Sequence, residues 1–157
     1  MRWSEIDTMT CSIARTLSVV GDRWTMLIIR DAFLGLRRFE AIQQDLHLTP
    51  HRLSDRLRKL VRDGILVRVE YEKHPRRFEY RLTEKGIDLY PLIVVMLEWG
   101  DRWMAGSAGA PVELVHRPCG QSIKPELTCP SCKSKIKPRE MSSRPGPAIR
   151  KRRSGLR

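Results

Sequence analysis

Three cysteines and one histidine in the last third of the chain have the spacing of metal ligands. The pattern is His116-x2-Cys119-x9-Cys129-x2-Cys132. Each close pair suits a tight turn that clamps a metal ion, and the two pairs together match a tetrahedral Cys3His zinc site. Such a site would be structural, because four protein ligands leave no open position, and it would staple a segment too small to fold by apolar burial alone. An unmetallated thiol tail and a regulatory disulfide are the alternatives.

Cys11 stands apart from the other cysteines, at the head of an expected helix. The positive end of the helix dipole and the nearby Arg15 both favour the reactive thiolate form. Cys11 is therefore a candidate redox sensor, and an inert buried thiol is the alternative.

A third group of residues has chemistry suited to duplex DNA. Thr49-Pro50 is typical of a helix start, because the hydroxyl can cap free N–H groups and proline needs no N–H donor there. The helix is expected to run to about Arg62 and to turn its leucines, together with Val61, toward the core. Its charged side then faces outward, and the first part of such a helix normally points at base edges in the major groove.

The outward side of this helix supplies most of the candidate DNA contacts. Arg52 could pair with guanine, and Asp55 could accept from a cytosine amino group or orient Arg52. Arg56 and Arg58 suit phosphates or internal salt bridges better, and a merely solvated basic face is the alternative to all of them. The predicted DNA-binding residues, including those of the following hairpin, are Arg38, Thr49, Pro50, His51, Arg52, Ser54, Asp55, Arg56, Arg58, Lys59, Lys73, His74, Arg76 and Arg77.

Residues 65–82 alternate apolar and polar side chains on either side of a short turn at residues 73–76, which predicts a β-hairpin. Its tip, about residues 72–78, is basic. Such a wing can lay cations on the DNA backbone or into the minor groove. The alternative is a polar turn that is basic by chance.

The elements that position these residues predict a winged helix-turn-helix with flanking dimerisation helices, mainly α with a small β-hairpin. A short helix at 38–46, a turn, the basic helix and the hairpin follow one another without a gap. Two helices are expected over residues 11–34, separated at Gly21-Asp22. A long helix over about 84–104 follows the hairpin, with Pro91 kinking it rather than ending it. Because this helix is apolar around much of its circumference, a second subunit is expected to cover one side.

The charge is unevenly distributed along the 157 residues, whose net charge is +12. Residues 1–105 contain 18 Lys and Arg against 15 Asp and Glu, and residues 106–157 contain 12 against 3. We expect a DNA-binding and dimerisation domain at 1–105, a linker at 106–111, the Cys3His segment at 112–140 and a basic disordered tail at 141–157. No internal repeat is apparent.

Several classes of protein are disfavoured by the sequence. There is no apolar secretory signal and no run of apolar residues long enough to span a membrane, so a cytoplasmic protein is expected. No glycine-rich phosphate loop or nucleophile elbow is present, and His47, His51 and His74 fall on a turn, a helix face and a wing, so no enzyme is indicated.

The chain resembles the HxlR-type branch of winged-helix bacterial transcription regulators, which is akin to the MarR proteins. The matching pieces lie between Cys11 and Trp103. They are Cys11-Ser12-Ile13-Ala14-Arg15-Thr16-Leu17, Gly21-Asp22-Arg23-Trp24-Thr25, Ile29-Arg30-Asp31, Arg37-Arg38-Phe39, Leu53-Ser54-Asp55-Arg56-Leu57-Arg58-Lys59-Leu60, Asp63-Gly64-Ile65-Leu66, Tyr80-Arg81-Leu82-Thr83-Glu84-Lys85-Gly86 and Glu98-Trp99-Gly100.

The resemblance implies a homodimer joined through the N-terminal and long C-terminal helices, and a double-stranded operator with two related half-sites. Some members of the branch sense oxidants or electrophiles through the cysteine at the position of Cys11, and some carry a cysteine tail like the one seen here. A response to thiol oxidation or to a small-molecule effector is compatible with this chain. The alternative function is a zinc-stapled RNA- or ribosome-associated protein that binds through its basic tail.

Overall fold

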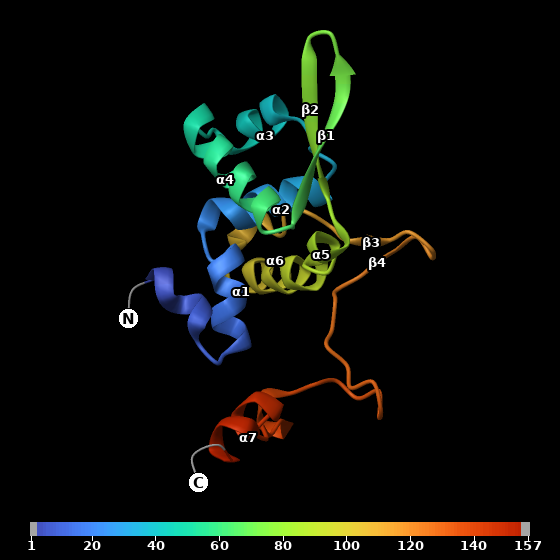
Figure 1. The fold of residues 1–157 in the computed structure, drawn as a ribbon. Helices are drawn as coiled ribbons and strands as arrows, with labels where there is room; N and C mark the ends of the chain where they lie inside the picture. The colour runs from blue at the N-terminus through green and yellow to red at the C-terminus, as the bar shows by residue number, and fades with distance from the viewer. Residues whose placement is uncertain (1–2, 155–157) are drawn as a thin grey trace. The chain divides into compact units, whose positions relative to one another are not determined.

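The computed structural model describes residues 3–154 and divides the chain into two compact units, Met1–Ile93 and Val94–Arg157. The described helices and strands of the first unit are drawn in Figure 1. They are η1 (Trp3–Thr8), α1 (Ser12–Val20), α2 (Arg23–Phe33), α3 (Phe39–Leu46), α4 (Pro50–Arg62), β1 (Leu66–Lys73), β2 (Arg76–Leu82) and α5 (Glu84–Ile87). Helix α6 (Tyr90–Met104) begins in the first unit and ends in the second.

The helices of the predicted winged helix-turn-helix begin where the sequence places their caps. The Asp22 carboxylate accepts hydrogen bonds from the backbone N–H groups of Trp24 (3.0 Å) and Thr25 (3.2 Å) at the start of α2. The Thr49 hydroxyl accepts from the backbone N–H of Arg52 at the start of α4, and Pro50 occupies the first helical position. Between α3 and α4, His47 adopts the left-handed conformation that turns the chain.

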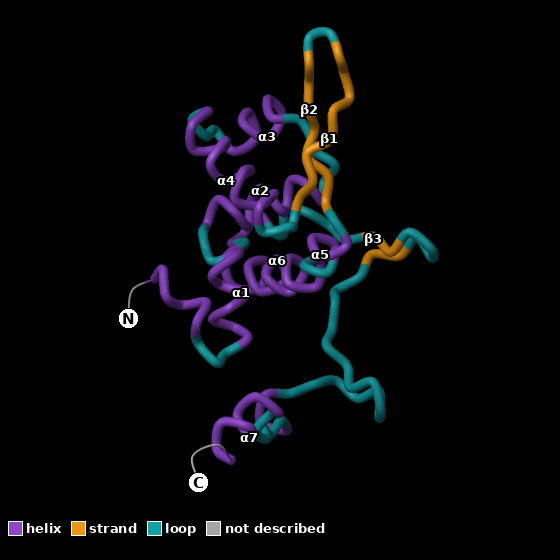
Figure 2. Tube along the Cα trace, in the orientation of Figure 1, coloured by secondary structure: helices purple, strands orange, loops and turns teal. Residues whose placement is uncertain are grey.

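Strands β1 and β2 form the predicted antiparallel hairpin, with Leu66 opposite Leu82 and Lys73 opposite Arg76. Figure 2 shows it in orange, extending beyond the helices of the first unit. A bulge between Glu70 and Glu72 interrupts the register near the tip. The backbone N–H of Tyr80 donates to the carbonyl of Arg37 at 2.7 Å, which ties the segment before α3 to β2.

The core of the first unit lies where α2, α3, α4 and the start of β1 meet. Its fully or almost fully buried side chains are Ile28, Ile29, Ile42, Leu53, Leu57, Leu60, Ile65 and Leu66. Burying each of these side chains contributes about 1.5–3 kcal/mol of transfer free energy. The three leucines come from one face of α4, so the core fixes which face of this helix remains outside.

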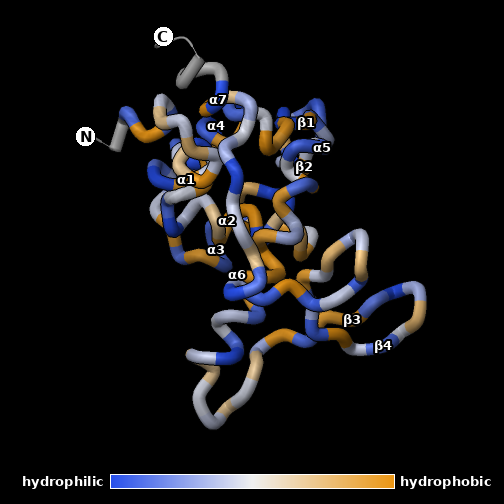
Figure 3. Tube along the Cα trace, turned by 90° about the horizontal axis from the view of Figure 1, so that it is seen from below, coloured by the Kyte–Doolittle hydropathy of each residue, from blue (hydrophilic) through white to orange (hydrophobic). Residues whose placement is uncertain are grey.

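The single long helix predicted over residues 84–104 is wrong. Helix α5 ends at Ile87 and α6 begins at Tyr90, so the chain breaks into two helices. Pro91 has no N–H to donate to the carbonyl of Ile87, four residues before it, and its ring would clash with that carbonyl. The proline therefore sits in the first turn of a new helix, where it causes no such conflict. Residues 92–97 of α6 form an apolar run, coloured as hydrophobic in Figure 3.

The second unit contains little regular structure after α6. Its elements are η2 (Gly106–Ala108), β3 (Val115–His116), β4 (Gln121–Ser122), η3 (Pro138–Glu140) and α7 (Pro147–Ser154). Helix α7 forms inside the segment for which the sequence predicts disorder. Pro147 is compatible with a helical first turn, and residues 147–150, whose side chains are described, are exposed and belong to no core. Residues 155–157 lie outside the described part of the chain.

The junction between the hairpin and α5 is closed by a glycine that has no room for a side chain. The Thr83 hydroxyl caps α5 by accepting from the backbone N–H of Gly86 (3.1 Å) and donates to the carbonyl of Gly64 (2.6 Å). A Cβ atom added to Gly86 would lie 2.3 Å from the carbonyl oxygen of Ile65. This contact is with backbone, so no side-chain rotation relieves it.

We therefore expect Gly86→Ala to lower the free energy of unfolding by about 1–3 kcal/mol through overpacking. Gly100→Ala is the matched control, because a Cβ there meets nothing within 4 Å in the middle of α6. That substitution should stabilise the protein slightly, by about 0.5–1 kcal/mol of helix propensity. Urea unfolding followed by circular dichroism measures both, and equal stability of Gly86→Ala and the wild type would contradict the close-packed junction.

Candidate nucleic-acid interface

The first turn of α4 presents a continuous exposed surface. Thr49, Pro50, His51 and Arg52 are all exposed, while Leu53 directly after them is fully buried. The cap at Thr49 holds the helix start in place, so these side chains project from a fixed backbone. The predicted groove-facing residues of the first turn therefore lie together on one outward surface.

Asp55 is the centre of a small charged network on the same face. Its carboxylate lies 3.3 Å from the Nε2 atom of His51, one helical turn before it, and 3.4 Å from the Nη1 atom of Arg58. Arg58 also donates from Nη2 to the Ser54 hydroxyl at 3.0 Å. Among the described residues, the Arg52 side chain has no ion-pair partner. The network therefore holds His51 and Arg58 in place and leaves the Arg52 guanidinium available.

Two predicted contact residues of α4 are turned toward the protein instead. The Lys59 ammonium donates to the carbonyls of Ser18 (3.1 Å) and Val19 (2.9 Å) and lies 2.6 Å from the Asp63 carboxylate. Arg56 Nε lies 3.3 Å from the Asp22 carboxylate. A cation on the last carbonyls of a helix satisfies free acceptors and opposes the negative end of its dipole. Lys59 therefore holds α4 against the C-terminal end of α1.

The wing carries exposed cations at its tip, as the sequence predicts. Lys73, His74 and Arg77 are exposed, and Arg76 pairs with the Glu70 carboxylate at 2.8 Å. This ion pair spans the hairpin on the surface, where it contributes little to stability. It does restrict the direction in which the Arg76 guanidinium points.

Arg68 is a basic wing residue that the sequence reasoning missed. Its guanidinium lies 3.5 Å from the centroid of the Phe78 ring, within the range of a cation–π contact. The strand alternation contains the missing signal: Arg68 pairs with Tyr80 across the hairpin, so it shares a face with Phe78, two residues away. On the same side, Arg38 lies over the Tyr71 ring at 4.6 Å.

These side chains line an open cavity of about 700 Å³ between α3 and the wing. Its cationic residues are Arg38, Arg68, Arg76 and Arg77. One acidic residue, Glu40, lines it as well. The cavity is therefore strongly positive and of a kind that attracts phosphate oxygens.

Cys11 lies at the N-cap of α1, as predicted, and is partly exposed. It makes no side-chain hydrogen bond to the first turn of the helix. All four cysteines of the chain are free thiols in the structure.

The predicted metal ligands are arranged as two separate pairs. The Nδ1 atom of His116 lies 3.2 Å from the Sγ atom of Cys119. Hydrogen bonds lower the pKa of the Cys132 thiol to about 7, and those with Ser134 contribute more than the one with Cys129. Within residues 3–154, no three His, Cys, Asp or Glu side chains are close enough to share a metal ion. Zinc binding therefore stays a prediction.

Comparisons with known proteins agree with this geometry. The family model for the HxlR-like helix-turn-helix matches residues 19–108. An HTH-type transcriptional regulator of Mycobacterium tuberculosis is 44% identical over 139 residues, which cover 88% of each chain. The crystal structure of PA1607, provisionally described as a transcription factor, has a TM-score of 0.80 and 37% identity, covering 88% of this chain and 96% of that one.

A second similar structure is that of the redox regulator HypR in its oxidized form. It is 34% identical with a TM-score of 0.55, and the match covers 59% of this chain and 96% of HypR. Of the helices in the described part of the chain, none is both long and apolar enough to cross a membrane. The family match, the relatives and the exposed α4 surface lead to one conclusion: this chain belongs to the HxlR-like helix-turn-helix family and is a transcriptional regulator with a helix-turn-helix DNA-binding fold.

Proposed function

We propose that the protein binds a double-stranded operator as a homodimer, with α4 of each copy in the major groove and the wing on the neighbouring backbone. The observation that carries this proposal is the exposed first turn of α4, where the Arg52 guanidinium has no ion-pair partner among the described residues. An arginine held on a rigid helix can donate two parallel hydrogen bonds to the O6 and N7 atoms of guanine.

The dimensions of α4 suit this placement. Its 13 residues span about 20 Å along the helix axis, and the major groove is about 12 Å wide. The Asp55 network supports the proposal further, because His51 and Arg58 are held by neighbours in the same helix. Residues that are already oriented lose less side-chain entropy on binding.

The wing is proposed to contact phosphates rather than bases. Its cations surround an open positive cavity next to α3, and within the described residues the Arg77 guanidinium at the tip forms no ion pair with an acidic side chain. Contacts of this kind fix the register of a protein on the duplex but carry no sequence information.

Arg52→Ala and Arg77→Ala therefore form a matched pair with different expected results. Arg52→Ala should cost about 1–3 kcal/mol on the operator and relax the choice of base at one position in each half-site. Arg77→Ala should weaken all duplexes alike and reduce the slope of log affinity against log salt by about 1. Titrations of operator and scrambled duplexes at several salt concentrations measure both quantities. An unchanged preference for the operator in Arg52→Ala would exclude Arg52 from base reading.

Homodimer formation is proposed from the exposed apolar side chains of the terminal helices. Leu92, Met96, Trp99 and Trp103 repeat at helical spacing on one side of α6, and the two tryptophans are 59% and 70% exposed. In α1, Ile13 is 71% exposed. A stripe of this kind is unfavourable in water, and a second copy of the chain would cover it.

Trp99→Glu should convert the dimer to a monomer, because a dimer would have to bury the new carboxylate in an apolar contact. We expect the subunit affinity to fall by about 2 kcal/mol or more, which is roughly thirtyfold in Kd. Sedimentation equilibrium measures the mass. Asp101→Ala is the control, since Asp101 lies on the opposite side of α6 from Trp99. A Trp99→Glu variant that sediments like the wild type would show that this stripe is not the subunit contact.

A response to thiol oxidation is proposed for Cys11. The similar structure of a redox regulator, HypR, supports this idea, as do the partly exposed position of Cys11 and its place at the start of α1. Modification of that thiol would change the start of a helix whose C-terminal end is clamped to α4 by Lys59. A change in α1 therefore has a direct route to the DNA-binding helix.

Diamide treatment should weaken operator binding of the wild type about tenfold or more but leave Cys11→Ser unaffected. A variant with serine at positions 119, 129 and 132 is the control, and it should keep the response because it keeps Cys11. Equal loss of binding in the wild type and in Cys11→Ser would assign the oxidation effect to another residue.

A further inference from the structure

The segment that holds the predicted metal ligands is a tandem repeat, although no repeat was recognised from the sequence. Residues 113–125 read ELVHRPCGQSIKP and residues 126–138 read ELTCPSCKSKIKP. A shift of 13 places aligns the glutamate, leucine, cysteine, isoleucine, lysine and proline of one copy with those of the other. The same shift places His116 on Cys129 and Cys119 on Cys132.

The backbone of the two copies follows the same hydrogen-bond pattern. The N–H of Ile123 donates to the carbonyl of Leu114 at 2.8 Å, and the N–H of Ile136 donates to Leu127 at 2.8 Å. The antiparallel pair of Val115 with Ser122 has its counterpart in a bridge between residues 128 and 135. Each copy is therefore a short hairpin with its two predicted ligands at the turn.

The two turns also share a left-handed residue directly after the second ligand. Gly120 has φ +69° and donates to the carbonyl of His116 at 2.8 Å. Lys133 has φ +60°, and its backbone N–H donates to the carbonyl of Cys129 at 2.8 Å. The left-handed conformation is strained for a lysine and unstrained for a glycine. The turn is thus formed in the second copy even though the sequence there does not favour it.

We propose that the two turns close around one Zn²⁺ ion bound by His116, Cys119, Cys129 and Cys132. The separation of 3.2 Å between His116 Nδ1 and Cys119 Sγ is near the roughly 3.5 Å that separates a nitrogen and a sulfur on one tetrahedral zinc ion. Thiolates with an imidazole select zinc over magnesium or calcium. The three cysteines bind as thiolates, so any proton still on a thiol is released to solvent as its Zn–S bond forms, and the site with a neutral imidazole has a net charge of −1.

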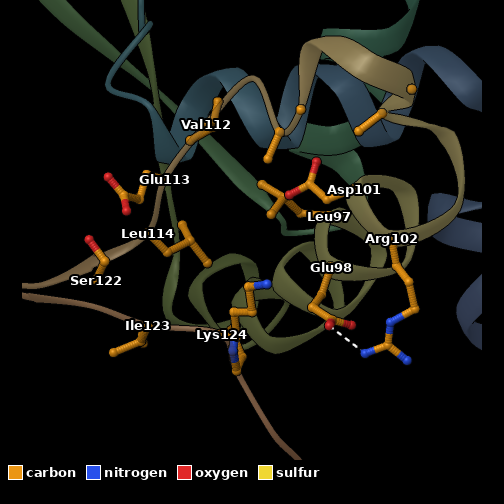
Figure 4. Close-up of a pocket in the computed structure, with 15 residues that line it drawn as sticks. Leu97, Glu98, Asp101, Arg102, Val112, Glu113, Leu114, Ser122, Ile123 and Lys124 are labelled. Atoms are coloured by element: carbon orange, nitrogen blue, oxygen red, sulfur yellow. Dashed lines mark hydrogen bonds and ion pairs between the residues drawn. The ribbon is translucent and has the colours of Figure 1, made fainter.

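Zinc would supply the compactness that the apolar residues of this segment do not. Ile123 and Leu127 are 44% and 59% exposed. In the first hairpin, Leu114 and Ile123 line an open cavity of about 690 Å³ together with Leu97 of α6, as Figure 4 shows, so apolar packing leaves space around this hairpin. The second hairpin follows through the connector at residues 124–126, so bringing its two cysteines to the first pair completes the ligand set.

The test uses the full-length, untagged protein. After removal of bound metal, Co²⁺ titration should give one equivalent per chain, with thiolate-to-cobalt charge-transfer absorption and the visible bands of tetrahedral cobalt, and Zn²⁺ should displace it. Cys129→Ser should lose this spectrum or bind cobalt at least tenfold more weakly. Cys11→Ser is the matched control and should bind like the wild type.

The alignment of His116 with Cys129 in the repeat leads to a second prediction about the ligand at position 116. His116→Cys restores the residue that the other copy has at this position, so it should keep one equivalent of cobalt and increase the charge-transfer absorption by about one third, from three thiolates to four. Absence of stoichiometric metal in the wild type would overturn the site. Equal cobalt binding by Cys129→Ser and the wild type, or loss of binding in His116→Cys, would overturn the proposed ligand set. None of these readouts depends on DNA binding.

Discussion

The burial of one leucine face fixes everything that α4 can do. Leu53, Leu57 and Leu60 are completely inaccessible to solvent. Rotating α4 about its axis by a fraction of a turn would expose these side chains, each of which contributes about 1.5–3 kcal/mol by burial. Because a helix is rigid over this length, fixing the buried face also fixes the charged one. The exposed positions of His51 and Arg52 are thus a consequence of apolar packing on the other side of the helix.

The buried leucines do not fix how far α4 is displaced relative to α1, or α3 relative to α2. Polar contacts fix these two positions. Lys59 binds the last carbonyls of α1, and Arg30 joins the Asp31 and Asp45 carboxylates of α2 and α3 at 2.6 and 2.5 Å. The Asp31 side chain is fully buried, and burial raises its pKa despite the hydrogen bonds from Arg30. Because the Arg30 side chain is 40% exposed, these ion pairs contribute little to stability, and they act mainly by joining α2 to α3. In a helix-turn-helix, the angle between α3 and α4 is the geometry that matters.

Local chemistry could be predicted from the sequence, whereas long-range partners could not. The caps at Asp22, Thr49 and Thr83 depend on residues within three positions, and the helix starts after Gly21-Asp22 and at Thr49-Pro50 were predicted. The role of Lys59 depends on carbonyls 40 and 41 residues away, which no local pattern reveals. The break before Pro91 was predictable in principle, because proline removes a specific hydrogen bond. The tandem repeat was not recognised from the pattern of ligands, because the first ligand is a histidine in one copy (His116) and a cysteine in the other (Cys129). Both residue types can bind zinc.

The uneven distribution of positive charge along the chain bears differently on general affinity for nucleic acid and on the choice of sequence. The first 105 residues have a small excess of positive charge, and the remaining 52 hold most of the net +12. Flexible or exposed cations attract any polyanion, and salt weakens that attraction for all sequences alike. Any contribution of the tail cations to DNA binding would therefore be the same for the operator and for competing DNA, and it would cancel in the ratio of the two affinities. A discriminating contact must instead be short, directed and held by a rigid support, and the capped first turn of α4 provides such a support for Arg52.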